Sequence, residues 1–114
     1  MALETKCVKI RLKSGALDRV RAWAQTINER RDEALETLRD EGVVIESVFL
    51  DSTADGDFLI YYMRAESFDR ADEVVQKSVH AIDAYHREFK RDTWIEREEL
   101  KALIDLDRIQ ESKT

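Results

Sequence analysis

Apolar and polar residues alternate along three stretches of the chain, Lys6–Lys13, Val43–Leu50 and Phe58–Arg64. A period of two places successive side chains on opposite faces, so each stretch is predicted to be a β-strand. A short polar segment joins the second and third stretches, which predicts a hairpin with its turn around Asp55 and Gly56.

Two longer stretches have apolar residues at every third or fourth position, which is typical of amphipathic helices. The first is Ala16–Glu41, and Gly42 stands where a helix C-terminus is expected. The second begins at Phe68 and continues through Ser78–Trp94. The first stretch exceeds the usual length of a helix, so a break is one expectation for residues 28–31.

The C-terminal part of the chain changes pattern twice. Ile95–Leu103 has helical spacing and is predicted to be a short helical turn, and Leu103–Ile109 alternates and is predicted to be a fourth strand. The polar face of this strand is acidic, whereas that of the first strand is basic, so the two are expected to pair. The expected cross-strand partners are Asp105 and Asp107 with Lys9 and Arg11. Residues Glu111–Thr114 are expected to form a frayed tail.

The predicted order of elements is strand, helix, strand, strand, helix, strand, which is the βαββαβ plan of the ferredoxin-like α+β fold. This fold has a four-stranded antiparallel sheet with its helices on one face. Both faces of the predicted hairpin are rich in apolar residues, so the face away from the helices needs a cover. A second copy of the chain would supply it in a homodimeric α/β barrel. The alternative cover is the chain's own C-terminal segment.

Composition and charge narrow the class of protein. The 114 residues, 43% of them hydrophobic, predict a single domain over residues 1–114. The net charge of −6 argues against a nucleic-acid-binding protein, which would present a basic face. The sequence shows no membrane span and no apolar secretion signal, and a membrane partner is therefore not expected. Cys7 is the single cysteine, so a reducing cytoplasm is the expected location.

Two polar side chains, Arg31 and His86, fall in the middle of the apolar helical stripes. Asp83 precedes His86 by three residues, close enough on a helix to orient the imidazole. His86 is either a core histidine with satisfied ring nitrogens or a general base. Arg31 is either turned outward by a helix break or buried beside a carboxylate or an anionic ligand, because an unpaired buried charge is prohibitive.

Glu46 shares a strand face with apolar residues, which would raise the pKa of its carboxyl group and make it a second acid or base. With His86 and Asp83 it forms the predicted catalytic set. The predicted ligand-binding residues are Arg31, Tyr62, Tyr85, Trp94 and His80.

A metal site is not predicted. His80, Asp83 and His86 stand at i, i+3 and i+6 and spread apart around a helix. Residues 51–57 have the spacing that begins a calcium loop, but Tyr62 occupies the twelfth position, where such a loop needs glutamate. A hairpin turn is the expectation for this segment.

Five segments of the chain resemble a small bacterial and archaeal family of unknown function, which is assigned to the dimeric α/β-barrel superfamily. The segments are Val8–Lys13, Asn28–Val43, Glu46–Leu50, Asp55–Ala65 and Ser78–His86. Family members often carry a proline after the first of the two histidines, where this chain has Ala81, and such a proline would open a helix at its first turn. The resemblance implies the fold and supplies no activity.

The wider superfamily includes cofactor-free monooxygenases, sugar mutarotases and lactone isomerases, whose pockets lie between sheet and helices. The resemblance thus implies a pocket without naming a reaction. One hypothesis is an enzyme or binder for a small anionic organic molecule that needs no cofactor, with Arg31 holding the anion and His86 moving a proton. The other is a structural or regulatory homodimer, in which Arg31 and Glu46 form a buried ion pair near His86.

Overall fold

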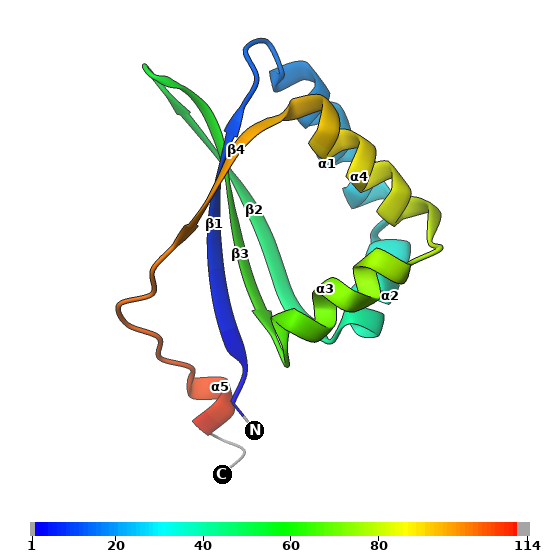
Figure 1. The fold of residues 1–114 in the computed structure, drawn as a ribbon, viewed down its shortest axis with the longest axis vertical. Coiled ribbons are helices and arrows are strands. Elements are labelled where there is room, and N and C mark those ends of the chain that lie inside the picture. The colour runs from blue at the N-terminus through cyan, green and yellow to red at the C-terminus, as the bar shows by residue number, and fades with distance from the viewer. Residues whose placement is uncertain (1, 112–114) are drawn as a thin grey trace.

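The computed structural model describes residues 2–111, which form one antiparallel sheet and a set of helices (Figure 1). The four strands lie in the order β2-β3-β1-β4, and helices α1–α4 cover one face of the sheet. The elements are β1 (Glu4–Leu12), α1 (Leu17–Glu29), α2 (Arg31–Glu41), β2 (Val43–Thr53), β3 (Gly56–Ala65), α3 (Phe68–Lys77), α4 (Ala81–Thr93), β4 (Trp94–Leu100) and α5 (Arg108–Glu111). The predicted ferredoxin-like fold is confirmed. Of the expected frayed tail, residues 112–114 lie outside the described part of the chain.

The core lies between the sheet and the helices. Val8, Ile10 and Leu12, which alternate along β1, are buried there against α1 and α4. Phe89 of α4 is fully buried, and its ring stacks on that of Trp23 with 4.3 Å between the centroids. Burial of these apolar side chains is the main force that holds the helices on the sheet.

Both long helical stretches are broken. The first breaks at Arg30, whose φ of −99° and ψ of 37° leave the helical region, so α1 and α2 are separate helices. This confirms the expected break and turns Arg31 outward as the exposed first residue of α2. The second stretch breaks between α3 and α4, and α4 begins at Ala81, where the related family often has proline. Four short helices therefore cover the sheet in place of two long ones.

A bulge between Val43 and Ile45 shifts the pairing of β2 with β3 by one residue. Because the side-chain period of a strand is two, this extra residue lets Val43 and Glu46 both face the helices. The chain enters β2 through Gly42, whose φ of 74° lies in the left-handed region that favours glycine. The bulge thus places the carboxyl group of Glu46 on the helical side of the sheet.

The prediction for the C-terminal elements was wrong. Residues 94–100 form β4, where a helical turn was expected over Ile95–Leu103, and residues 101–107 are irregular, where Leu103–Ile109 was expected to be a strand. The sequence of β4 is rich in glutamate and arginine, which favour helices. Pairing with the edge of β1 overrides this local preference, and the backbone N–H of Lys13 donates to the carbonyl of Thr93 at 2.8 Å, where α4 gives way to β4.

The expected charge pairing with β1 exists, but with other acidic residues. Lys9 and Arg11 lie opposite Glu98 and Glu96 of β4. Asp105 and Asp107 instead form ion pairs with Arg64 on the outer face of β3. The segment of residues 101–109, here called the C-terminal arm, therefore touches the outer face at Arg64.

The outer face of the sheet remains partly open. Phe49 is 58% exposed on this face even with the C-terminal arm in place. The arm also carries exposed apolar side chains, those of Leu103, Ile104, Leu106 and Ile109. The C-terminal arm therefore covers the outer face only around Arg64. The predicted alternative, in which the chain's own C-terminal segment covers this face, holds for that part of the sheet alone.

Candidate functional site

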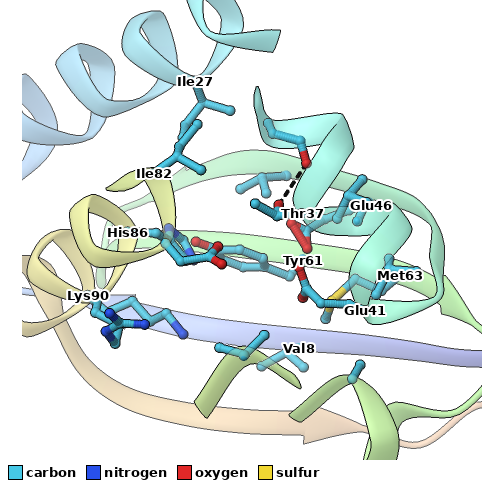
Figure 2. Close-up of a pocket in the computed structure, with 18 of the residues that line it drawn as sticks. Val8, Ile27, Thr37, Glu41, Glu46, Tyr61, Met63, Ile82, His86 and Lys90 are labelled. Atoms are coloured by element: carbon cyan, nitrogen blue, oxygen red, sulfur yellow. Dashed lines mark hydrogen bonds between the residues drawn. The ribbon is translucent and has the colours of Figure 1, made fainter. Parts of the chain in front are cut away.

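A cavity of about 680 Å³ lies between the sheet and the helices and opens to solvent. Its walls come from α1–α4 and from all four strands. Figure 2 shows His86 and Lys90 projecting from α4, with Tyr61 rising from β3 between the helices. A volume of this size is typical of sites for small organic molecules.

The rings of Trp23, Tyr61 and Trp94 form an aromatic wall of the cavity, and His86 packs against the first two. The indole N–H of Trp23 donates a hydrogen bond to Nδ1 of His86 at 3.1 Å, and the two rings stack. Because Nδ1 accepts this bond, the neutral imidazole carries its proton on Nε2. Burial, assisted by the positive charge of Lys90, lowers the pKa of His86 to about 3. His86 is therefore neutral at physiological pH and can act as a hydrogen-bond donor through Nε2.

Two buried polar atoms of the aromatic wall lack a hydrogen-bond partner among the described residues. They are the hydroxyl oxygen of Tyr61 and the indole nitrogen of Trp94. The two rings meet edge to face, with centroids 5.5 Å apart. Burial, with a further contribution from the charge of Glu46, raises the pKa of Tyr61, so its hydroxyl stays protonated. A buried donor without a partner is costly, and an oxygen atom of a ligand would relieve that cost.

Two carboxyl groups of the cavity have raised pKa values. Burial is the main cause for both, and the negative charge of Asp83 adds to it. The pKa of Glu41 rises to about 7, while the positive charge of Lys90 partly opposes the rise at Glu46. Glu46 lines the cavity, and its side chain keeps access to solvent. Glu41 can therefore take up or release a proton near neutral pH, and Glu46 holds its proton more tightly than an ordinary carboxyl group does.

Lys90 is the half-buried cation of this site. Its Nζ lies 5.2 Å from the centroid of the Trp94 ring, and it forms no ion pair with the part of the chain that the structure describes. Burial lowers the pKa of Lys90, Glu46 opposes that change, and Arg97 reinforces it. An ammonium group in this setting is available to a ligand.

Five of the eight predicted site residues line the cavity. They are His86, Asp83, Glu46, Arg31 and Trp94. Arg31 is exposed at the cavity wall and forms no ion pair with Glu46 in the described part of the chain, so the sealed Arg31–Glu46 cluster is absent. Asp83 does not orient His86, because its carboxylate bonds to the hydroxyl of Ser78 and Trp23 bonds to the imidazole.

The other three predicted residues lie outside the cavity. Tyr62 points to the outer face of the sheet, where its hydroxyl accepts a hydrogen bond from Arg64. The hydroxyl of Tyr85 accepts one from Arg19 at 3.3 Å. His80 pairs through Nε2 with Asp40 at 2.7 Å, which raises the pKa of His80. Each of these side chains thus has a local structural partner.

Sequence reasoning missed Trp23, Tyr61, Glu41 and Lys90. Lys90 follows His86 by four residues, which places both on one helical face, and this spacing was a usable signal. Tyr61 alternates with Tyr62, and the pattern separated their faces without showing which face meets the helices. Among residues 2–111, there is no group of three or more His, Cys, Asp or Glu side chains able to hold a metal ion.

Solved structures of other proteins share this fold. An L-rhamnose mutarotase from Formosa agariphila is 18% identical, with a TM-score of 0.57 over 91% of this chain and 99% of that one. A protein named as an antibiotic biosynthesis monooxygenase from Nitrosomonas europaea is 16% identical, with a TM-score of 0.53 over 84% of each chain. The Rv0793 protein from Mycobacterium tuberculosis is 18% identical, with a TM-score of 0.52 over 93% and 100%. These likenesses establish the ferredoxin-like fold.

No curated protein matches the sequence significantly. The model of a family of unknown function (DUF6176) matches residues 3–111. The chain therefore belongs to this family. None of the described helices has the length and apolar character needed to cross a membrane.

Proposed function

We propose that this member of the DUF6176 family binds a small organic acid in the cavity between sheet and helices, and moves a proton within it without a cofactor. The observation that carries the proposal is one open cavity in which an acid–base carboxyl group, a neutral imidazole and a half-buried ammonium group meet. Groups whose pKa values depart from their ordinary range in a cleft are typical of functional sites.

The charges of the cavity favour an anion. Five basic side chains line it, those of Lys6, Arg31, Arg87, Lys90 and Arg97, against four acidic ones, those of Glu41, Glu46, Asp72 and Asp83. Because the pKa of Glu41 rises to about 7, part of the negative charge is absent near neutral pH, and the basic side chains outnumber the charged carboxylates even without Lys90, whose own pKa is lowered. The site is then electropositive, although the chain as a whole carries −6.

The groups for proton transfer are Glu46 and His86. With its raised pKa, the carboxyl group of Glu46 can accept a proton from a bound acid and return it. The Nε2–H of His86 can donate a hydrogen bond to a developing negative charge, as a neutral donor in a partly dry site. Proteins named as a mutarotase and a monooxygenase share this fold, so the choice of proton transfer rests on these residues and not on the fold.

The functional unit in this proposal is a homodimer. The outer face of the sheet keeps Phe49 58% exposed and Leu100 38% exposed, and the C-terminal arm adds further apolar groups beside it. A second copy of the chain would cover these groups. We place the dimer in the cytoplasm, because Cys7 is a free thiol on this face of the sheet and a reducing compartment preserves it.

A thermal-shift screen of small carboxylic acids, each compared with its neutral amide, tests the proposal. An acid that binds should raise the melting temperature by mass action. Replacing Lys90→Met should weaken its binding about tenfold or more, because a charge-assisted hydrogen bond is lost. The control Lys101→Met removes an exposed lysine outside the cavity. Stabilisation that is equal for acids and amides, or unchanged in Lys90→Met, would contradict the proposal.

Proton transfer is tested on the acid that binds best. In deuterated water, the protein should exchange a carbon-bound hydrogen of the acid, and Glu46→Gln should lose this exchange while retaining the binding. Glu88→Gln serves as the matched control, because Glu88 is exposed on α4 and does not line the cavity. Exchange at the wild-type rate in Glu46→Gln would remove Glu46 from its role.

A further inference from the structure

We propose that Lys90 is a nucleophile, which forms an imine with the carbonyl carbon of a keto acid bound in the cavity. The inference rests on the proposed function and narrows its ligand from organic acids in general to acids that also carry a ketone or aldehyde. It assigns a covalent step to Lys90, which projects from α4 into the cavity beside His86 (Figure 2).

The position of Lys90 is unusual for a lysine. It follows His86 by one helical turn on α4, so both side chains enter the cavity from the same wall. Its side chain is half-buried and lies over the face of the Trp94 ring. Most lysines extend into water, as exposed Lys101 does, and an ammonium group there is strongly hydrated and unreactive. Lys90 has lost much of that hydration, and no carboxylate of residues 2–111 forms an ion pair with it.

The charged groups around Lys90 come from four elements. Glu46 of β2 and Asp72 of α3 favour the ammonium form, while Arg97 of β4 and Arg87 of α4 disfavour it. Burial is the largest influence and also favours the neutral amine, so the net effect lowers the pKa of Lys90. Desolvation together with neighbouring cations is a known way to activate an amine for attack on a carbonyl group.

The cavity supplies the acid that the reaction needs. The neutral amine of Lys90 attacks the carbonyl carbon, a C–N bond forms, and the oxygen takes a proton from the carboxyl group of Glu46. The amine nitrogen returns one proton to Glu46, which leaves a neutral carbinolamine. Glu46 then protonates the hydroxyl group, and the nitrogen lone pair expels it as water. The products are a protonated imine on Lys90, the carboxylate of Glu46 and one water molecule, so atoms and charge balance.

The raised pKa of Glu46 suits this role, because a carboxyl group that holds its proton more tightly than usual can serve as the acid in both steps. The guanidinium groups of Arg87 and Arg97 at the cavity wall can meet the carboxylate of the keto acid. The imine that results withdraws electrons from the neighbouring carbon, which makes the proton transfer of the proposed function easier.

Borohydride trapping on the wild-type protein is the direct experiment. The protein is incubated with keto acids from pyruvate to phenylpyruvate, sodium borohydride is added, and the adduct is located by peptide mass spectrometry. We expect a mass gain equal to the probe less one oxygen atom, confined to Lys90. Adducts spread over exposed lysines such as Lys101 and Lys77, or no adduct with any keto acid, would overturn the assignment.

Two variants and a matched ligand separate this inference from the proposed function. Lys90→Arg keeps the positive charge and removes the nucleophile, so it should bind a keto acid but form no adduct, whereas Lys101→Arg should behave as wild type. Lactate, which lacks the carbonyl group of pyruvate, should bind without trapping. If keto and hydroxy acids both bind and no adduct forms, the imine is refuted and the binding site stands. If neither binds, the proposed function fails as well.

Discussion

Protonation of His86 provides a measurable link between the site and the stability of the fold. Burial lowers the pKa of His86 from 6.5 to about 3, so the folded state binds this proton more weakly than the unfolded chain does. The free energy of unfolding therefore decreases as the pH falls below 6.5, the pKa of His86 in the unfolded chain, and His86 has no effect on it at higher pH. At 1.36 kcal/mol per pKa unit, the loss through His86 is about 2.5 kcal/mol at about pH 4.5, and it approaches about 5 kcal/mol only well below about pH 3.

Other groups of the cavity act in the opposite direction. The raised pKa of Glu41 means that the folded state gains stability as the pH falls from about 7 toward 4.5. The pH dependence of the wild-type stability is thus the sum of the contributions of these groups. The difference in unfolding free energy between wild type and His86→Gln isolates the contribution of the histidine. Glutamine can accept the hydrogen bond of Trp23 and cannot be protonated in this range. Urea unfolding of both proteins at a series of pH values gives the difference.

We expect His86→Gln to gain about 2.5 kcal/mol relative to wild type on going from about pH 7.5 to about pH 4.5. Nuclear magnetic resonance of the two histidine rings gives an independent check. His80, paired with Asp40, should titrate above the ordinary value, and His86 should remain neutral down to acidic pH. A stability difference that does not change with pH, or a His86 ring that titrates near 6.5, would refute the buried, neutral imidazole.

Three further predictions concern the stability of the fold and the attachment of the C-terminal arm. Phe89→Ala should destabilise the fold by about 3–5 kcal/mol in urea unfolding, because it removes a fully buried ring stacked on Trp23. A loss below about 1 kcal/mol would show that the ring is not buried. Glu41→Gln should stabilise the protein by about 1–2 kcal/mol at about pH 8, with the gain vanishing below about pH 4.5, because the folded state disfavours the carboxylate. A gain that is independent of pH would contradict this cause. Arg64→Met should release the C-terminal arm by removing its ion pair with Asp105, so that trypsin cleaves the arm faster, and an unchanged cleavage rate would show that the pair does not hold it.

The fold could be predicted as far as its elements are strongly periodic. Alternation in β1 and β3 and the apolar stripes of the helices placed these elements and their order correctly. The prediction failed at β4, because glutamate and arginine favour a helix locally and only pairing with β1 makes residues 94–100 a strand. Tertiary contacts of this kind leave no local trace in the sequence.

The site was predicted where a polar residue interrupts an apolar pattern. His86 and Glu46 were found in this way, and both line the cavity. Arg31 was not the buried anion-binding residue of one alternative, because the break at Arg30 turns it outward. Tyr62 was chosen in place of Tyr61, since alternation alone does not tell which face of a strand meets the helices. The hydrogen bond between Trp23 and His86 joins residues 63 positions apart, and no spacing rule predicts it.

The chain contains two tryptophans, Trp23 and Trp94, and both line the cavity. Their indole N–H resonances therefore report on ligand binding at this site. The most direct measurement follows both resonances by nuclear magnetic resonance while the best acid from the thermal-shift screen is added. Saturable shifts of both indoles, much weaker in Lys90→Met, are the expected result. Shifts confined to outer-face residues such as Phe49, or indole resonances that do not move at saturating acid, would contradict a binding site in the cavity.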